Sequence, residues 1–336
     1  MRTLAEKARA ALDPVYWDFF AGGAGEERTL VANEDAFDRC RIVPRVLRGV
    51  GPRDLRTRLF GTDVAMPVLI APTAFHRLAH PDGEAGTAAG ARAADTVMVV
   101  SSAATQPVEE IAATGAKLWF QLYPQPDPGF EAHVIRRAER AGCRALVVTV
   151  DSPVLGRRDR DRRNGFADLP AGYACENMRD AGGRVRDIVM DPALGWPQID
   201  RIRAATRLPV LLKGVLHPAD ARLAAAHGVD GLIVSNHGGR QLDGAIATLD
   251  ALPAVRAATG LPVLLDGGVR RGTDILVALA LGAAAVLLGR PILWALATGG
   301  APGVRQLLSE MRAELDQAMV LAGAQRTADL IPDLVR

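Results

Sequence analysis

The 336-residue sequence has few cysteines and no large excess of charge of one sign. Its three cysteines, Cys40, Cys143 and Cys175, show neither a CxxC motif nor a spacing typical of metal ligands. This predicts free thiols in a reducing compartment. The 40 lysines and arginines nearly balance the 38 aspartates and glutamates, and no concentrated basic face is evident. The balance argues against nucleic acid as the main partner.

A long hydrophobic run is also lacking. The longest, ILVALALGAAAVLLG at 275–289, is too short for a membrane span, and Gly282 near its middle predicts the end of a helix followed by a strand. The first residues, MRTLAEKARAALDP, are charged and amphipathic and have no apolar core of the kind found in signal peptides. We therefore expect a cytoplasmic protein without a membrane partner.

One pattern recurs along the chain. A short apolar run ends in a polar or glycine-rich corner, and an alanine-rich helical stretch follows. Eight such runs are expected to be strands: 67–72, 97–102, 118–123, 145–151, 209–214, 231–236, 262–268 and 285–290. Strands that alternate with helices pair in parallel, and eight of them predict an α/β fold, a closed (β/α)8 TIM barrel. The rival is a doubly wound open sheet, but no GxGxxG motif follows the first strand.

Residues 1–336 are expected to form a single domain, because one α/β barrel can reach this length. Residues 1–60 precede the first strand and predict an N-terminal cap, helical at first and then irregular. Residues 167–196 follow the fourth strand and show little periodicity. They would lie on the active-site side of a barrel, either as a mobile lid or as a disordered surface insertion.

The carboxyl ends of the strands carry the chemistry in this fold. The last two strands end in DGGVRRG (266–272) and LGRP (288–291), which combine glycine with arginine and predict a phosphate site. A buried lysine at the end of the fifth strand requires a negative charge, so Lys213 either pairs with Asp266 or stabilises a ring that becomes anionic when reduced. Neutral hydrogen bonds to a polar heteroaromatic ring would come from Ser101, Gln121, Thr149 and Ser235.

Two arginines and a histidine complete the set of strand-end residues. Arg158 and Arg240 suit a substrate carboxylate. His237, in VSNHGGRQLD, lies beside them, and Asp151 could orient it as a base. A single histidine at a strand end is more often structural. The joint occurrence of such residues at eight strand ends favours a catalytic site.

With these motifs the sequence resembles the FMN-dependent 2-hydroxy acid oxidases and dehydrogenases, the glycolate, lactate and mandelate group. The resemblance covers nearly the whole chain and is most specific in SNHGGRQLD and DGGVRRG. It also includes DFFAGGAGEERTL, APTA, AHPDGE, FQLY, TVDSPVLGRRDRDRRNGF, LLKGV and LGRP. GGRQLDGA and GRPILWALA look most like hydroxymandelate-type oxidases. The resemblance implies FMN at the carboxyl end of a barrel, oxidation of an L-2-hydroxy acid to a 2-keto acid, electron transfer to oxygen or another acceptor, and a homotetramer.

The resemblance also implies roles for individual residues. Contacts to the flavin ring and ribityl chain would come from Pro72, Thr73, Ala74, Ser101, Gln121, Thr149, Lys213 and Ser235. The phosphate site would comprise Asp266, Gly267, Gly268, Arg270, Gly289 and Arg290. The catalytic set would be His237 as base, Asp151 as its supporting carboxylate, Tyr123 as a hydroxyl on the substrate oxygen, and Lys213. Arg158 and Arg240 would clamp the substrate carboxylate. Whether His237 takes the hydroxyl proton or the α-proton stays open.

Two positions depart from the glycolate-oxidising members. Phe19 stands where they carry a tyrosine that bonds the carboxylate, and Ala103 stands where they carry a bulky aromatic residue. A hydroxyl donor is lost and space is gained, which favours an aryl or bulky acid such as mandelate or 4-hydroxymandelate. The alternatives are a lactate- or glycolate-type oxidase, an FMN enzyme acting on an amine or a peptide-derived substrate, a barrel isomerase, a non-catalytic flavin-binding scaffold and a flavin-free phosphate-binding barrel.

Overall fold

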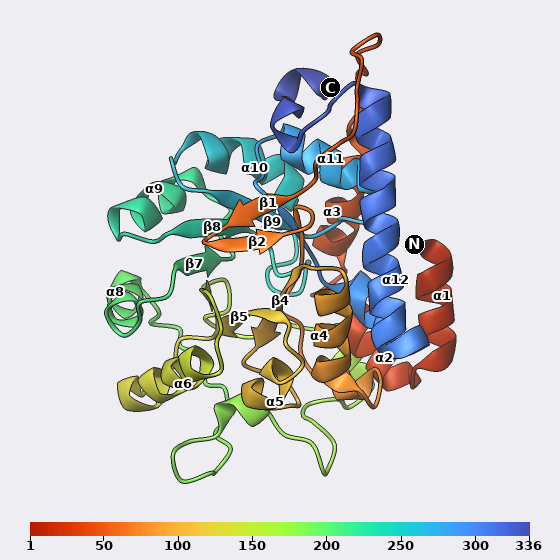
Figure 1. Ribbon diagram of the computed structural model, residues 1–336. Coiled ribbons are helices and arrows are strands. Elements are labelled where there is room, and N and C mark those ends of the chain that lie inside the picture. Colours follow the sequence, from red (N-terminus) through yellow and green to blue (C-terminus); the bar gives the residue numbers. More distant parts are fainter.

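A computed structural model describes residues 1–336, and a closed parallel barrel lies at its centre (Figure 1). The barrel strands are β3 (Val68–Ile70), β4 (Val97–Ser101), β5 (Lys117–Leu122), β6 (Leu146–Thr149), β7 (Val210–Lys213), β8 (Gly231–Val234), β9 (Val263–Asp266) and β10 (Val286–Leu288). Each strand pairs with the next along the chain, and β10 closes the barrel on β3. All eight expected strands are present, so the predicted (β/α)8 fold is confirmed.

Helices surround the barrel. They are α4 (Gly83–Ala93), α5 (Val108–Ala112), α6 (Pro128–Arg140), α8 (Trp196–Ala204), α9 (Pro218–Ala226), α10 (Thr248–Ala257), α11 (Gly272–Ala280) and α12 (Arg290–Ala322), with the short α7 (Asp159–Arg163) in the loop after β6. As predicted for 275–289, α11 ends before Gly282, which has a φ of 102°, and β10 follows. No helix combines the length and apolarity needed to cross a bilayer.

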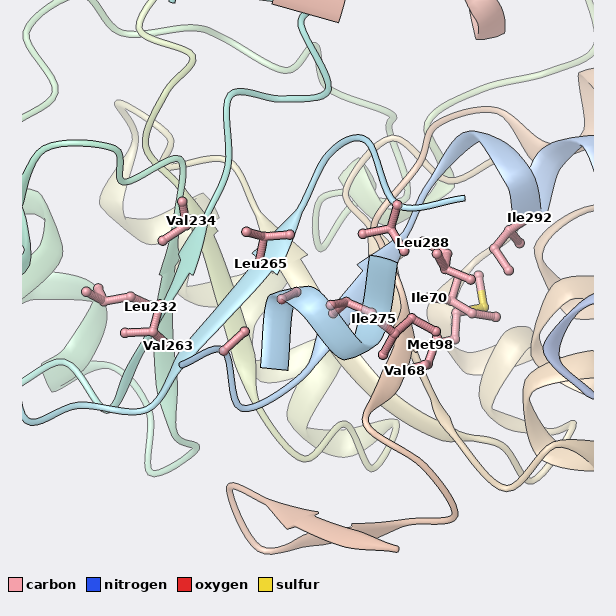
Figure 2. Packing of buried hydrophobic residues seen from close by; sticks show 14 of the residues in the cluster. Val68, Ile70, Met98, Leu232, Val234, Val263, Leu265, Ile275, Leu288 and Ile292 are labelled. Atoms are coloured by element: carbon pink, nitrogen blue, oxygen red, sulfur yellow. The ribbon is translucent and has the colours of Figure 1, made fainter. Parts of the chain in front are cut away.

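Side chains on each barrel strand alternate between two apolar clusters, as the pleat of a strand requires. On β3, Val68 and Ile70 join a cluster of 72 buried residues between the barrel and its helices, whereas Leu69 joins a separate cluster of 14 buried residues inside the barrel. Figure 2 shows part of the larger cluster, with labelled residues from β3, β4, β8, β9 and β10 and from α11 and α12. The barrel is therefore a packed core rather than a pore.

The N-terminal cap consists of α1 (Arg2–Ala11), α2 (Pro14–Ala21) and α3 (Arg28–Arg39), followed by an irregular segment. A hairpin of β1 (Thr57–Leu59) and β2 (Thr62–Val64) was not predicted. It covers the amino end of the barrel. Its turn residue Phe60 packs edge-on against Trp119 at 5.6 Å between ring centroids, and a side chain at Gly231, the first residue of β8, would collide with the Phe60 ring.

Specific hydrogen bonds fasten the 167–196 segment to the barrel. Asn177 accepts a hydrogen bond from the Val108 amide at 2.7 Å and donates one to the Ser101 carbonyl at 2.9 Å. The buried Gln125 side chain accepts from the Val189 amide at 3.2 Å and donates to its carbonyl at 3.4 Å. The segment thus has specific anchors at the ends of β4 and β5. Its movement as a lid stays a prediction.

Candidate active site

A cavity of about 910 Å³ opens at the carboxyl end of the barrel, a size typical of small-molecule sites. The predicted site residues on its lining are Phe19, Pro72, Thr73, Ala74, Ser101, Ala103, Tyr123, Arg158, Lys213, His237, Arg240, Asp266, Gly267, Gly268, Arg270, Gly289 and Arg290. The other four, Gln121, Thr149, Asp151 and Ser235, join this set through hydrogen bonds. The fold therefore brings every predicted site residue to one place.

His237 lies at the centre of this site. Its Nδ1 is 2.9 Å from a carboxylate oxygen of Asp151, and its Nε2 is 3.5 Å from the hydroxyl of Tyr123. Burial lowers the pKa of His237, although the negative charge of Asp151 acts in the opposite direction. The pKa of Asp151 is also lowered, because the charges of His237 and Lys213 outweigh the effect of its burial. An ionised Asp151 accepts a hydrogen bond from Nδ1–H of the neutral ring, which leaves Nε2 as a free proton acceptor beside the cavity.

The backbone around His237 is unusual. His237, Gly238 and Gly239 have φ values of 60°, 64° and 72°, three successive left-handed residues. A Cβ atom on Gly239 would lie 2.6 Å from the amide nitrogen of Leu30, and the Gly239 carbonyl accepts a hydrogen bond from Ala24 at 2.8 Å. The glycines thus allow the cap to approach closely. A left-handed histidine carries a conformational cost that the surrounding contacts must offset.

Two half-buried guanidinium groups face the cavity beside His237. Arg240 donates hydrogen bonds to the carbonyls of Phe19 and Gly22 at 2.7 and 2.8 Å and lies 5.1 Å from the centre of the Phe19 ring. The side chain of Arg158 donates no hydrogen bond within the chain, and its buried Nε has no partner. Its nearest carboxylate is Asp161, at 4.0 Å. Burial lowers the pKa of both guanidinium groups, and Arg158 lowers that of Arg240 further. The pair would therefore gain from a bound anion.

A polar layer crosses the ends of β4, β5 and β6. The side-chain oxygen of Gln121 accepts from the Ser101 hydroxyl at 3.0 Å, and its amide nitrogen donates to the Thr149 hydroxyl at 3.0 Å. These contacts fix the orientation of the Gln121 amide. Ser101 remains on the cavity lining, in position to contact a polar ring.

Lys213 forms a buried ion pair in the floor of the cavity. Its ammonium lies 3.1 Å from Asp266 and donates to the Ser235 hydroxyl at 2.9 Å. The predicted pairing with Asp266 is therefore present. Burial opposes the charge of Lys213, but Asp266 and Asp151 outweigh it and raise the pKa of the lysine. The other carboxylate oxygen of Asp266 is buried without a partner, so one acceptor remains for a ligand.

The predicted phosphate region has free backbone donors. The N–H groups of Gly267, Gly268 and Gly289 find no acceptor within the chain, and α12 begins immediately after Gly289. Unpaired amides at a glycine turn and a helix N-terminus form an anion site. The side chains of the two nearby arginines contact protein here. Arg270 pairs with Glu34 at 2.8 Å, and Arg290 donates to the carbonyls of Phe20, Ala21, Gly22 and Gly238.

An apolar wall that the sequence did not reveal completes the cavity. Phe75 stacks on Phe19 at 5.3 Å between ring centroids, and Phe166 packs against Phe19 at 4.9 Å. The Phe75 amide donates to the Ala103 carbonyl at 3.2 Å, and Phe75 has a φ of 64°. Phe75 directly follows the APTA motif and Phe166 ends the charged run after β6, and these positions were the only signals in the sequence.

The barrel, the His237–Asp151 pair, the arginine pair and the anion site define a small-molecule enzyme site with a proton acceptor, a cationic seat for an anionic ligand and a place for a phosphate. The profile of the family described as FMN-dependent dehydrogenase matches residues 8–336, so the chain belongs to the FMN-dependent dehydrogenase family. The chain is an oxidoreductase of the FMN-dependent 2-hydroxy acid oxidase group, as predicted. The free amides of the anion site and the unpaired oxygen of Asp266 fit a phosphorylated, polar cofactor such as FMN.

Several curated relatives cover nearly the whole chain. The 4-hydroxymandelate oxidase of Amycolatopsis orientalis is 45% identical over 96% of this chain and 95% of its own length. The L-lactate oxidase of a Nostoc species is 44% identical over 96% and 94%. The glycolate oxidase of Spinacia oleracea is 44% identical over 96% and 91%. Their names refer to different acids, so the comparison identifies the family without fixing the substrate.

Solved structures of mandelate oxidase are similar in fold. The complex with 3,3-difluoro-2-hydroxy-3-phenylpropionic acid has a TM-score of 0.93 and 43% identity over 100% of this chain and 97% of that chain. The complex with benzoyl-formic acid has a TM-score of 0.92 and 45% identity over 97% and 95%.

Proposed function

We propose that this protein oxidises an aryl or otherwise bulky L-2-hydroxy acid, of the mandelate or 4-hydroxymandelate kind, to the 2-keto acid. The observation that carries the proposal is the combination of an aromatic wall, Phe19, Phe75 and Phe166, with the small Ala103 on the same cavity lining. Aromatic rings favour offset-stacked or edge-to-face contacts with other aromatic rings. The complexes of mandelate oxidase with phenyl-bearing acids support the same substrate class.

The arginine pair orients the substrate. Its carboxylate binds Arg158, whose donors are all unused, and Arg240, whose guanidinium is held by cap carbonyls. This contact fixes the α-carbon and its hydroxyl near His237. Nε2 of His237 then accepts a proton, and Asp151 stabilises the resulting imidazolium through Nδ1. The Tyr123 hydroxyl, close to Nε2, contacts the substrate oxygen.

Bound FMN supplies the two-electron acceptor for this oxidation. The free N–H groups of Gly267, Gly268 and Gly289 would hold its phosphate, and the N–H of Ala74, which also has no acceptor in the chain, would contact its ring system. Lys213 keeps a positive charge in the floor of the cavity, where negative charge would develop.

Anaerobic reduction of the bound flavin by a panel of acids tests the proposal. We expect L-mandelate and L-4-hydroxymandelate to bleach the flavin absorbance faster than L-lactate or glycolate do. A strong preference for glycolate would exclude the aryl assignment and leave a lactate- or glycolate-type oxidase. Oxygen added after reduction shows whether oxygen serves as the acceptor, since a rapid return of the oxidised spectrum would then follow.

A further inference from the structure

A carboxylate of the chain itself lies beside the site proposed for the substrate carboxylate. Asp161 is in α7 and lines the cavity, and its side chain is 12% exposed. It lies 4.0 Å from Arg158, and no other carboxylate approaches Arg158 or Arg240 within that distance. Two other acidic groups of the site already have partners, because Asp151 bonds His237 and Asp266 pairs with Lys213.

We propose that Asp161 is the resident counter-ion of the Arg158–Arg240 pair, that it sets the affinity of the site for carboxylate ligands, and that it takes up a proton when they bind. The inference rests on the proposed carboxylate clamp and concerns its regulation. Before a ligand binds, the negative charge of Asp161 partly offsets two half-buried positive charges. A ligand carboxylate adds a second negative charge to the same two arginines, so the two anions repel across the clamp.

The surroundings of Asp161 determine the direction of this effect. Three arginines lie near its carboxylate: Arg158 and Arg160 from its own loop and helix, and Arg240 from the loop after β8. The nearby acidic group is Asp18 of α2. Burial raises the pKa of Asp161 against the attraction of the arginines, with Asp18 adding to the rise. A bound carboxylate raises this pKa further, so binding takes up a proton at pH values between the pKa of the free site and that of the occupied site. Affinity for carboxylates therefore increases as pH falls through this window.

Asp161 also discriminates between ligands by charge. A neutral amide of the same shape is not repelled by Asp161 and gains less from the arginines. Replacing Asp161 by a neutral residue should therefore strengthen the binding of acids and leave the binding of amides nearly unchanged.

The experiment uses the FMN-loaded protein and non-oxidisable ligands, with binding followed by the change in flavin absorbance. Phenylacetate, oxalate and phenylacetamide are titrated into the natural protein, Asp161→Asn and Asp161→Ser, and into Asp159→Asn as a matched control. Asp159 belongs to the same helix, but its carboxylate pairs with Arg157 and does not line the cavity. Calorimetry in two buffers of different ionisation enthalpy measures proton uptake. Because His237 also titrates in the cavity, the relevant quantity is the difference between the natural protein and the variant.

We expect Asp161→Asn and Asp161→Ser to bind phenylacetate and oxalate about tenfold more tightly at neutral pH, the order expected for removing one like charge a few ångströms away in a partly shielded site. Phenylacetamide affinity should change less than about twofold. Proton uptake should be smaller than in the natural protein, and Asp159→Asn should behave like the natural protein. Unchanged or weaker acid binding in both Asp161 variants would overturn the inference. Failure of the natural protein to bind phenylacetate while it binds oxalate would instead contradict the aryl proposal, and the oxalate data would still test Asp161.

Discussion

The two ends of the barrel differ in how their polar groups are satisfied. At the amino end the β1–β2 hairpin covers an inner cluster of 14 apolar residues. At the carboxyl end lie three of the four buried side-chain atoms in the chain that lack a hydrogen-bond partner, on Asp151, Arg158 and Asp266. The amino end thus contributes none of these three unpaired atoms, whereas the carboxyl end keeps unpaired polar atoms that a ligand can bind. The fold thus separates the residues that stabilise it from those that react.

Backbone strain alone does not distinguish the two ends. Left-handed non-glycine residues occur at both, with Phe60 in the hairpin turn at the amino end and Phe75 and His237 beside the cavity. At Phe60 the strain accompanies apolar packing on Trp119, whereas at His237 it accompanies unpaired polar atoms. Unsatisfied buried polar groups are therefore the better marker of function in this molecule.

The largest effect is expected at the carboxyl end. His237→Asn removes the proton acceptor while keeping a residue that tolerates the left-handed backbone, so kcat should fall roughly 10²- to 10⁴-fold. FMN content and the free energy of unfolding should change little. Stopped-flow reduction of the flavin and denaturant unfolding measure the two properties separately. Near-full turnover in this variant would remove His237 from the proposed mechanism.

The matching change at the amino end is Trp119→Ala. The Trp119 ring is fully buried in the inner cluster, so its truncation should lower the free energy of unfolding by about 3–5 kcal/mol. The variant that remains folded and loaded with FMN should keep its kcat. A selective loss of kcat at unchanged stability would show that the two ends are coupled.

Substrate choice should respond next. Ala103→Trp fills the space beside the aromatic wall, and we expect the ratio of kcat/KM for mandelate over glycolate to fall about 10- to 100-fold. Ala103→Ser is the control, since it adds little volume. An unchanged ratio in the tryptophan variant would show that the aryl group of the substrate does not bind beside Ala103.

The pH profile tests the electrostatics of the reactive end. His237 must be neutral to accept a proton, and burial lowers its pKa, so kcat/KM should fall only at pH values below the ordinary range of histidine. Asp151 opposes this lowering. In Asp151→Asn the acid limb should therefore move to still lower pH, and the maximum rate should also fall because the base is weaker. An acid limb that moves to higher pH in Asp151→Asn would contradict the pairing of His237 with Asp151.

The smallest effect is expected from Phe19→Tyr. The ring of Phe19 lies beside Arg240, and a hydroxyl there could add one hydrogen bond to the substrate carboxylate. One such bond should lower KM about fivefold, the usual size of its effect. Steady-state kinetics with mandelate measures it, and a loss of activity would show that the apolar edge of Phe19 contacts the substrate.

The sequence predicted the carboxyl end of the barrel better than the amino end. Strand-end residues such as His237, Lys213 and Arg240 could be located because parallel strands bring their carboxyl ends together, whatever the details of packing. The β1–β2 hairpin was missed because three-residue strands give almost no periodic signal, and Phe60 depends on a contact with Trp119 far along the chain. Contacts of this kind arise from tertiary packing, which local patterns do not encode.

The same limit applies within the site. The sequence predicted Arg270 and Arg290 for a phosphate site, but it did not predict that their guanidinium groups contact Glu34 and cap carbonyls. Asp161 lies inside the charged run GRRDRDRR, and nothing in that run indicates which of its charges faces the cavity. Residue type and strand position predict which groups gather at the cavity, but not how each side chain is paired once it is there.

The bonds between Arg290 and the end of α2 also have a kinetic meaning. Residues 20–22 are held by a side chain that follows them by 268 to 270 positions. At about 5–20 residues per second, synthesis delivers Arg290 roughly 13–54 s after the carbonyls that it binds. Arg290 directly follows β10, the strand that closes the barrel, so its bonds to the end of α2 can form only after the last strand has been synthesised.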